Sequence, residues 1–320
     1  MVLFIHMLAA RRYGLADWEH TLLEGGRIAN EPLHALAESE YGTVVTSTSG
    51  KGFFEPHGSM LPEMVDGTAV DIFDFCARVD EAASRRGATV LPLPPRDGAL
   101  ARYLDTLGLG PTDPYVTLHC REEGYKLQGV HGPRNATIGN YGPALEYLTG
   151  RGYTVIRLGD PSMTPLPAQD RVVDYARGPD KTPELDVLLT THAAFHIGCS
   201  SGLSLVPLLF GRPCLFLNWY PNILLPWGRH TWTVLKRLVR TDSGETVTDP
   251  QTLFRAGMVV DPVMLEHLGY ALEENAPEEI LETVRDFDVG LITQQACDSP
   301  HTFIYASDRK RVQVRRPTSV

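Results

Sequence analysis

Apolar and polar positions follow one another in a regular order from residue 115 onward. Short apolar runs, typical of buried strands, alternate with segments whose apolar residues recur at helical spacing. The predicted strands span 115–120, 153–158, 172–175, 195–198 and 213–217, and the predicted helices span 141–149, 183–190 and 203–210. Such alternation indicates right-handed crossovers and a parallel sheet covered on both faces. The pattern therefore predicts an α/β protein with a Rossmann-like sheet, which binds ligands at the carboxyl ends of its strands.

The pattern is less regular before residue 114 and after residue 218. It predicts helices at 17–24, 70–86, 99–107, 232–239 and 277–287, and strands at 41–46 and 89–93. The segment 111–114 is the best candidate for a linker. We therefore expect a short N-terminal α/β domain at 1–113, a Rossmann-like domain at 114–290 and a basic, solvated tail at 291–320.

Composition narrows the classes of function. The net charge of −10 argues against a protein that binds nucleic acid. The five cysteines include no Cys-x-x-Cys pair, which indicates reduced thiols and a cytoplasmic location. The apolar stretch 2–10 is followed by its arginines instead of being preceded by them, unlike a signal peptide. No apolar run is long enough for a membrane span.

The stretch 194–218 is the first candidate for chemistry. Ser200 and Ser201 stand between a predicted strand and a predicted helix, at the position of a helix N-cap. A helix that begins at the carboxyl end of a parallel strand offers free N–H groups and a positive dipole end to a phosphate. Gly202 would let a ligand approach the backbone closely. The alternative is that the two serines only cap the helix.

The end of the first regular strand carries the second candidate. Alternation along the strand puts His119 and Arg121 on one face, directed toward the same crevice as the Ser200 turn. The planar, always charged guanidinium of arginine suits a diphosphate. Alone, His119 would be a core histidine and Arg121 a surface charge. Opposite the Ser200 turn, the two residues together predict a diphosphate site.

Residues 115–220 resemble the donor half of GT-B glycosyltransferases. The likeness is greatest to bacterial proteins related to the superfamily of GDP-fucose and nodulation fucosyltransferases, in which a strand ends in His-x-Arg, as His119-Cys120-Arg121 does here. The resemblance implies that His119 and Arg121 hold the diphosphate of the donor and that Asp160 faces its nucleobase. The turn at 198–202 is also similar to that of heptosyltransferases.

The resemblance implies a metal-independent, inverting glycosyltransferase. It would move a hexosyl or deoxyhexosyl group from a nucleoside-diphosphate sugar, with GDP favoured, to a glycan or small-molecule acceptor. Arg121 and the two serines would stabilise the leaving group. Glu122 and Glu123, just beyond Arg121, are the candidates for the general base, with Glu123 favoured and Glu55 and His57 as alternatives. The Asp286 and Asp288 pair is expected to be solvated, so neither a metal nor another cofactor is expected.

Two features depart from the family. Glu122 stands where the fucosyltransferases usually have a second arginine, and the N-terminal half is short for a full acceptor domain. Either the acceptor domain is reduced, or a second copy of the chain or a partner subunit completes the cleft, or the true start lies upstream.

Two further segments are candidates for ligand contacts. In the loop 121–140, Arg134 and Asn135 are the favoured contacts to the phosphates or the sugar, ahead of Lys126 and His131. The tryptophans of the segment 219–232 would form a platform for a sugar or, alternatively, pack in the core.

The sequence leaves two other functions open. A nucleotide-sugar epimerase uses the same fold and would convert a free nucleotide sugar without an acceptor. A non-catalytic subunit would keep the fold and support a partner transferase. Neither reading involves nucleic acid or a membrane span.

Overall fold

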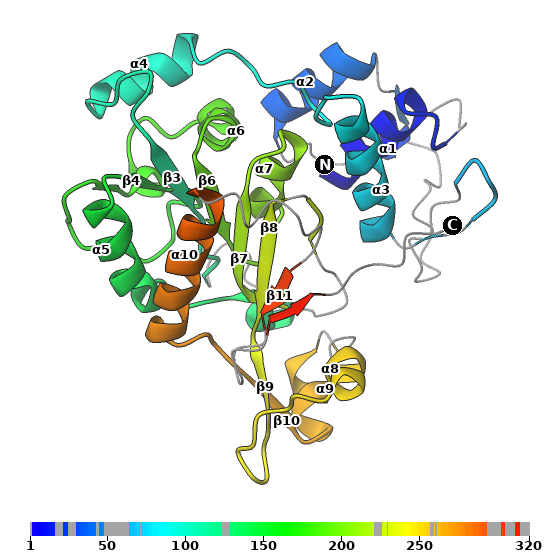
Figure 1. Cartoon of the computed structure of the whole chain (residues 1–320), viewed down its shortest axis with the longest axis vertical. Helices are drawn as coiled ribbons and strands as arrows, with labels where there is room; N and C mark the ends of the chain where they lie inside the picture. Colours follow the sequence, from blue (N-terminus) through cyan, green and yellow to red (C-terminus); the bar gives the residue numbers. More distant parts are fainter. Residues whose placement is uncertain are drawn as a thin grey trace.

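A parallel β-sheet forms the centre of the computed structural model (Figure 1). The structure describes residues 2–16, 22–24, 30–42, 45–47, 64–68, 70, 72–122, 129–220, 226–228, 230–256, 259, 261–292, 302–304 and 311–313. Within them, the main sheet has the order β12-β11-β8-β7-β6-β3-β4-β5. Its strands are β3 (Tyr115–Leu118), β4 (Thr154–Arg157), β5 (Val172–Val173), β6 (Phe195–Gly198), β7 (Cys214–Trp219), β8 (Thr231–Leu235), β11 (Thr302–Ile304) and β12 (Arg311–Gln313). Neighbouring strands are parallel, except that β12 is antiparallel to β11.

The strand order contains one reversal, which lies between β3 and β6. From β3 the chain builds outward through β4 to β5, and it then returns to the other side of β3 to build β6, β7 and β8. This is the doubly wound order, and its ligand crevice lies outside the carboxyl ends of the two strands at the reversal. The predicted α/β class with a Rossmann-like parallel sheet is confirmed.

Helices cover both faces of the sheet. One face carries α5 (Gly142–Gly150) and α10 (Pro277–Ile292); the other carries α4 (Gly98–Thr106), α6 (Pro183–Thr191) and the short α7 (Val206–Leu209). Strand β7 shows why both layers are needed. Its Leu215 and Leu217 pack in the α5 and α10 core, while Cys214 and Phe216 pack in the core on the α7 side, because successive side chains point to opposite faces.

The N-terminal elements extend the layer that contains α7. They are α1 (Val2–Arg12), α2 (Glu31–Tyr41), α3 (Ile72–Arg85) and a parallel strand pair, β1 (Leu22–Glu24) and β2 (Val45–Ser47). Residues of α1 and α3 share one buried core with α7 and β7. Asn30 before α2 donates to the carbonyl of Pro183 at the start of α6 (2.9 Å). These helices therefore lie beside α6 and α7, at the opposite end of the molecule from α8 and α9 (Figure 1).

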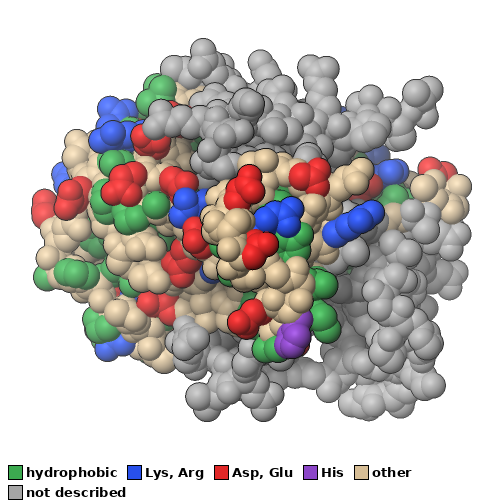
Figure 2. All heavy atoms as spheres, turned by 90° about the horizontal axis from the view of Figure 1, so that it is seen from below, with side chains coloured by type: hydrophobic (Ala, Val, Ile, Leu, Met, Phe, Trp, Pro, Cys, Tyr) green, Lys and Arg blue, Asp and Glu red, His purple; other side chains and the backbone are tan. Residues whose placement is uncertain are grey.

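A separate unit leaves the sheet after β8 and returns before α10. It contains the antiparallel strands β9 (Arg237–Arg240) and β10 (Tyr270–Glu273), with α8 (Pro250–Ala256) and α9 (Pro262–His267) between them. A small core of its own holds it together, made of Leu238, Val247, Leu253, Ala256 and Leu265. We call residues 237–276 the β9–β10 unit. It lies at the carboxyl end of β8, and Figure 2 views the molecule from that end, where acidic and basic side chains are mixed on the described surface.

Several sequence predictions of secondary structure were wrong. The helix expected at 232–239 is instead part of β8 and β9, which follow one another almost directly. The apolar residues of the two strands, at 232, 234, 235, 238 and 239, recur at helical spacing, which is why the pattern indicated a helix. The strand expected at 89–93 does not form; Leu91 donates to the carbonyl of Leu209 outside any sheet. Of the strand expected at 41–46, Tyr41 ends α2 and 45–46 lie in β2.

The remaining differences concern helix ends and short turns. Residues 22–24 of the helix expected at 17–24 form β1, and 17–21 lie outside the described residues. Short 3₁₀ turns complete the fold: η1 (Gly129–Arg134), η2 (Ile138–Tyr141), η3 (Tyr175–Arg177) and η4 (Leu203–Leu205). No helix among the described residues is both long and apolar enough to cross a membrane.

Candidate functional site

The candidate site lies at the carboxyl ends of β3 and β6, where the strand order reverses. Arg121 follows β3, and Cys199 and Ser200 follow β6. The backbone N–H of Arg121 donates to Sγ of Cys199 (3.1 Å), so the two strand ends are in direct contact. The structure thus brings together the two elements that the sequence singled out.

Arg121 is held by a neutral partner. Its side chain belongs to a residue that is only 8% exposed, and its Nε donates to Oδ1 of Asn135 (3.2 Å). Among the described residues, no carboxylate forms a salt bridge with its guanidinium. A buried cation without a counter-ion is unfavourable, which is the arrangement expected where an anion binds.

Lys236 is a second buried cation at this site, and the sequence analysis missed it. It lies between β8 and β9, is only 6% exposed, and its Nζ donates to the backbone carbonyl of Asn135 (2.5 Å). Burial lowers the pKa of Lys236, while Glu274 acts in the opposite direction. The position of Lys236 directly after an apolar run could have indicated a residue at the carboxyl end of a strand. It was missed because residues 232–239 were predicted to be a helix.

Three cations, Arg121, Lys236 and Arg134, lie close enough to the Cys199 thiol to affect its pKa. Burial raises the pKa of Cys199 to about 11, although Arg121, Lys236 and Arg134 each favour the thiolate. Arg134 ends η1 and is half-buried; burial lowers its pKa, and the nearby charge of Arg121 lowers it further. We call the three cations Arg121, Arg134 and Lys236, together with the neutral Asn135 that links two of them, the cation cluster.

The Ser200 turn differs from the expected helix start. Oγ of Ser200 accepts a hydrogen bond from the N–H of Tyr220 (2.7 Å), which ties the end of β6 to the end of β7. The following helix is a 3₁₀ turn and one turn of α7, with no side-chain cap at Gly202. The prediction of a continuous α-helix over 203–210 is therefore wrong. Ser201 is half-buried and Gly202 is exposed.

The glycine that the turn requires is Gly198, the last residue of β6. A Cβ there would lie 2.7 Å from Nε2 of His196 and from Oγ of Ser204. At Gly202, a Cβ would meet nothing within 4 Å. Close packing therefore explains Gly198, while the space around Gly202 is open on the side where a Cβ would stand.

His119 faces the neighbouring strand β4. Its Nδ1 hydrogen-bonds with the carbonyl of Leu158 (3.2 Å), and the residue is 4% exposed. Burial lowers the pKa of His119 to about 4, and the charges of Arg157 and Arg121 act in the same direction. The ring is neutral at neutral pH. Its described hydrogen bond is to the protein backbone, which fits the alternative of a core histidine, and the predicted contact between His119 and a diphosphate stays a prediction.

Glu122 belongs to an ion-pair network beneath the end of β4. Its Oε2 accepts from Arg157 (2.6 Å) and from the N–H of Thr164 (3.1 Å). Arg157 is fully buried and also pairs with Asp174 (3.3 Å). The carboxylate of Glu122 therefore holds a buried arginine, which does not fit the role of general base considered for it from the sequence.

Asp160 follows β4 and stabilises its own turn. Its Oδ1 accepts from the N–H (2.9 Å) and the Oγ (2.6 Å) of Ser162, and these hydrogen bonds lower its pKa. The carboxylate is partly exposed at the carboxyl end of the sheet. The predicted contact between Asp160 and a nucleobase stays a prediction.

Several other predictions have a plain outcome. Glu123, Glu55, His57 and Lys126 lie outside the described residues, as does the side chain of His131. Asp288 is buried, not solvated as expected: it accepts from Tyr147 and Tyr153 and pairs with Arg151. Within the described part of the chain, no three His, Cys, Asp or Glu side chains are placed to hold a metal.

The tryptophans of 219–232 form no sugar platform. Trp219, Trp227 and Trp232 are 3%, 0% and 5% exposed, and all three belong to the hydrophobic cores on the two faces of the sheet. The alternative reading, that these residues serve packing, is therefore confirmed.

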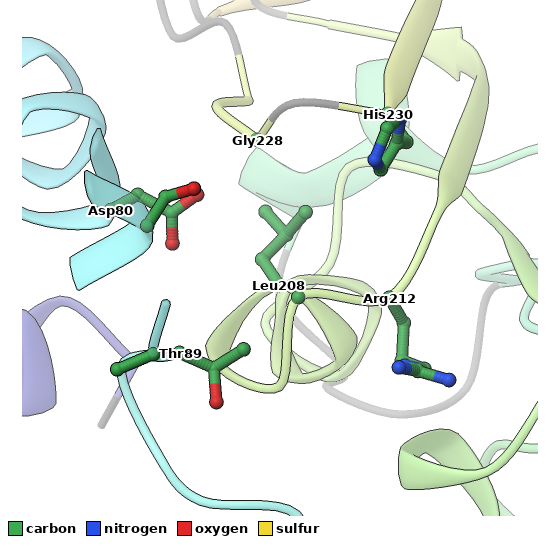
Figure 3. Close-up of a pocket in the computed structure, with 9 residues that line it drawn as sticks. Asp80, Thr89, Leu208, Arg212, Gly228 and His230 are labelled. Atoms are coloured by element: carbon green, nitrogen blue, oxygen red, sulfur yellow. The ribbon is translucent and has the colours of Figure 1, made fainter. Parts of the chain in front are cut away.

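One small cavity, of about 190 Å³, lies away from the cation cluster. Arg212 and His230, which precede β7 and β8, line one side of it, and Asp80 of α3 lies on the other (Figure 3). It is therefore at the amino ends of these strands. Ligands of doubly wound sheets bind at the opposite, carboxyl ends, so this cavity is not the candidate site.

Comparisons with known proteins give partial similarities only. No family model matches the chain, and no curated protein matches it. The E. coli ADP-heptose LPS heptosyltransferase II is 15% identical over 63% of this chain and 54% of its own, with a TM-score of 0.38. The dodecameric iron-containing heptosyltransferase TibC in complex with ADP-D-β-D-heptose is 14% identical over 91% and 73%, with a TM-score of 0.44.

A third structure, a family 9 glycosyl transferase from Veillonella parvula, is 14% identical over 72% of this chain and 66% of its own, with a TM-score of 0.36. The chain thus spans about half the length of the E. coli enzyme. Scores below 0.5 do not establish a shared fold, so the α/β assignment rests on the strand order of the chain itself. None of these three structures is described as a fucosyltransferase.

Proposed function

We propose that the chain is a glycosyltransferase that binds a nucleoside-diphosphate sugar at the cation cluster. One observation carries the proposal: two buried cations, Arg121 and Lys236, share Asn135 at the carboxyl ends of the sheet, and no described carboxylate forms a salt bridge with either. The strand order puts this cluster at the ligand crevice of a doubly wound sheet. A diphosphate is the anion that such a pair of cations suits.

The proposed reaction is a displacement at the anomeric carbon of the sugar. A hydroxyl of a glycan or small-molecule acceptor forms the new bond to this carbon, the bond to the diphosphate oxygen breaks, and the acceptor proton passes to a carboxylate. Arg121 and Lys236 would stabilise the charge on the leaving diphosphate, an effect often worth several kcal/mol. Glu123 is the proposed general base, and inversion, metal independence and a GDP donor are parts of the same proposal.

A second candidate is a nucleotide-binding subunit whose cleft another chain completes. It is favoured by the position of α1, α2 and α3, which pack beside α6 and α7 and do not face the carboxyl ends of β3 and β6 (Figure 1). In the proposal, a partner subunit or a second copy of the chain then supplies the acceptor side. An epimerase is not favoured.

The first test is nucleotide binding. The wild type and Arg121→Ala are compared by thermal shift with GDP, UDP, dTDP, ADP and CMP; ADP is included because TibC binds an ADP-linked heptose. A ligand at one hundred times its dissociation constant stabilises the folded state by about 2.7 kcal/mol. We expect one nucleotide to stabilise the wild type and not the variant.

A transfer assay then separates the two candidates. Release of the nucleotide from the matching donor by the isolated chain, in the presence of acceptor mixtures, supports a complete enzyme. Binding without turnover supports the subunit. If no nucleotide stabilises a well-folded wild type, the proposal is wrong for the isolated chain.

A further inference from the structure

We infer that Lys236 binds the same diphosphate as Arg121 and makes the site selective for a diphosphate over a monophosphate. The inference rests on the proposed function and deepens it, because it assigns the two phosphates to two different cations. Neither the strand pattern nor the glycosyltransferase resemblance assigned Lys236 a role.

Among the described residues, no carboxylate forms a salt bridge with Lys236. A lysine is rarely buried unless it is paired, and the hydrogen bond of its Nζ goes to a backbone carbonyl, that of Asn135. Glu274 is the carboxylate that acts on it, but Glu274 accepts hydrogen bonds from Thr137 and Asn140 and forms no salt bridge with Lys236. An anionic ligand would supply the missing charge.

Two different strands of the sheet bring the two cations to Asn135. Arg121 follows β3 and Lys236 follows β8, with β6 and β7 between them. Neighbouring strands are about 4.8 Å apart, so the two strand ends are about 14 Å apart. Both side chains nevertheless reach Asn135, Arg121 at its side-chain oxygen and Lys236 at its backbone oxygen. Two positive centres that share one neutral residue suit an anion with two charged groups.

Lys236 also has a purely structural role, since its hydrogen bond holds the loop that carries Asn135. The test must therefore separate charge from anchoring. Lys236→Gln keeps an N–H donor for the carbonyl of Asn135 and removes the charge. Arg237→Gln is the matched control, because it removes one positive charge at the next residue, where the guanidinium already pairs with Glu273 (3.3 Å) and Glu279 (3.8 Å).

The experiment is titration calorimetry of the wild type, Lys236→Gln, Lys236→Met and Arg237→Gln with GDP against GMP and with ADP against AMP. A hydrogen bond to a charged group is worth about 1.5–3 kcal/mol, or ~10- to 100-fold in affinity. We expect the wild type to prefer the diphosphate by ~10-fold or more. Lys236→Gln and Lys236→Met should lose most of this preference, chiefly by weakening the diphosphate, and Arg237→Gln should keep it.

Three results would contradict the inference. If the wild type binds the diphosphate no better than the monophosphate, the assignment of Lys236 is wrong, while the proposed function is not affected. The same holds if folded Lys236 variants keep the wild-type preference for the diphosphate. A wild type that binds none of the four nucleotides overturns the proposed function and, with it, this inference. Circular dichroism of each variant without ligand shows whether it is folded; where Lys236→Met is not, Lys236→Gln decides.

Discussion

Asn218 and Asn275 exchange two backbone-to-side-chain hydrogen bonds. The N–H of Asn218 donates to Oδ1 of Asn275 (2.7 Å), and the N–H of Asn275 donates to Oδ1 of Asn218 (2.6 Å). Nδ2 of Asn275 also donates to the carbonyl of Leu235, the residue before Lys236 (3.0 Å). Asn218 has a φ of 52°, in the left-handed region that asparagine tolerates better than most residues. The pair therefore fixes the end of β7 to both ends of the β9–β10 unit, next to the cation cluster.

Removal of Asn275 should be costly. Asn275→Ala leaves the N–H of Asn218 and the carbonyl of Leu235 without their partners, and both asparagines are fully buried. An unsatisfied buried polar group costs about 1–3 kcal/mol, so we expect a loss of roughly 2–4 kcal/mol in the free energy of unfolding. Urea denaturation measures it. A loss below about 0.5 kcal/mol would show that water replaces these bonds.

Arg157 and Arg85 give a contrast between a buried and an exposed ion pair. Arg157→Met leaves Glu122 and Asp174 without the fully buried guanidinium that joins them, and breaking a buried pair costs about 3–5 kcal/mol. Arg85→Gln breaks an exposed pair with Glu81 on α3, worth about 0.3–0.5 kcal/mol. Denaturant unfolding of both variants checks the difference. Equal losses would mean that the Arg157 network contributes no more than a surface pair.

The buried His119 predicts a loss of stability in mild acid. Burial lowers its pKa from 6.5 to about 4 in the folded protein. Between these values the unfolded chain binds more protons than the folded chain. The contribution of His119 to the free energy of unfolding is therefore unchanged above pH 6.5, and the protein loses stability as the pH falls from 6.5 toward 4.

The variant His119→Gln should therefore lose less stability than the wild type between pH 7 and pH 5, by about 1–2 kcal/mol. His267→Gln is the control, because it removes a histidine that is exposed on α9. Urea unfolding at both pH values gives the comparison. A His119→Gln profile parallel to that of the wild type would mean that His119 titrates normally in the folded protein.

The two adjacent serines should behave differently. Ser200→Ala removes the acceptor of the Tyr220 N–H inside the protein and should cost about 1–3 kcal/mol of unfolding free energy. Ser201→Ala removes a half-buried hydroxyl and should change stability by less than about 0.5 kcal/mol. Thermal unfolding distinguishes them. Equal losses of stability in the two variants would contradict the roles argued from the structure. Weaker nucleotide binding in Ser201→Ala alone would indicate that the hydroxyl of Ser201 contacts the nucleotide sugar.

The sequence predicted the sheet well because strand and helix signals there are local. The runs at 115–120, 153–158 and 195–198 all end at one edge, which is why Arg121 and the Ser200 turn could be expected to meet. The prediction for β8 was wrong because β8 and β9 are consecutive, and their apolar residues at 232, 234, 235, 238 and 239 together have helical spacing. Lys236, which lies between the two strands, was therefore placed inside a helix and was not considered for the site. Asn275 could not be found at all, since its partner is 57 residues away in the sequence.

The helix after Ser200 was overestimated for a different reason. Leu203, Val206, Leu209 and Phe210 have helical spacing, but Pro207 and Gly211 allow only one α-helical turn before β7. Spacing of apolar residues predicts which face is buried, and it does not predict how long the hydrogen-bonded helix is. The positive charges at the candidate site are therefore those of side chains, Arg121, Arg134 and Lys236.

The β9–β10 unit begins and ends at one place, since Asn275 bonds to Leu235 across its base. A segment whose two ends meet can be lengthened, shortened or exchanged at little cost in chain entropy and without a shift in the strands that flank it. Its separate core makes such exchange easier still. Related chains can therefore be expected to vary most in this module. An engineer who wishes to change what approaches the cation cluster can graft a different module between residues 236 and 274, which keeps Glu274 and Asn275 and their hydrogen bonds at its base.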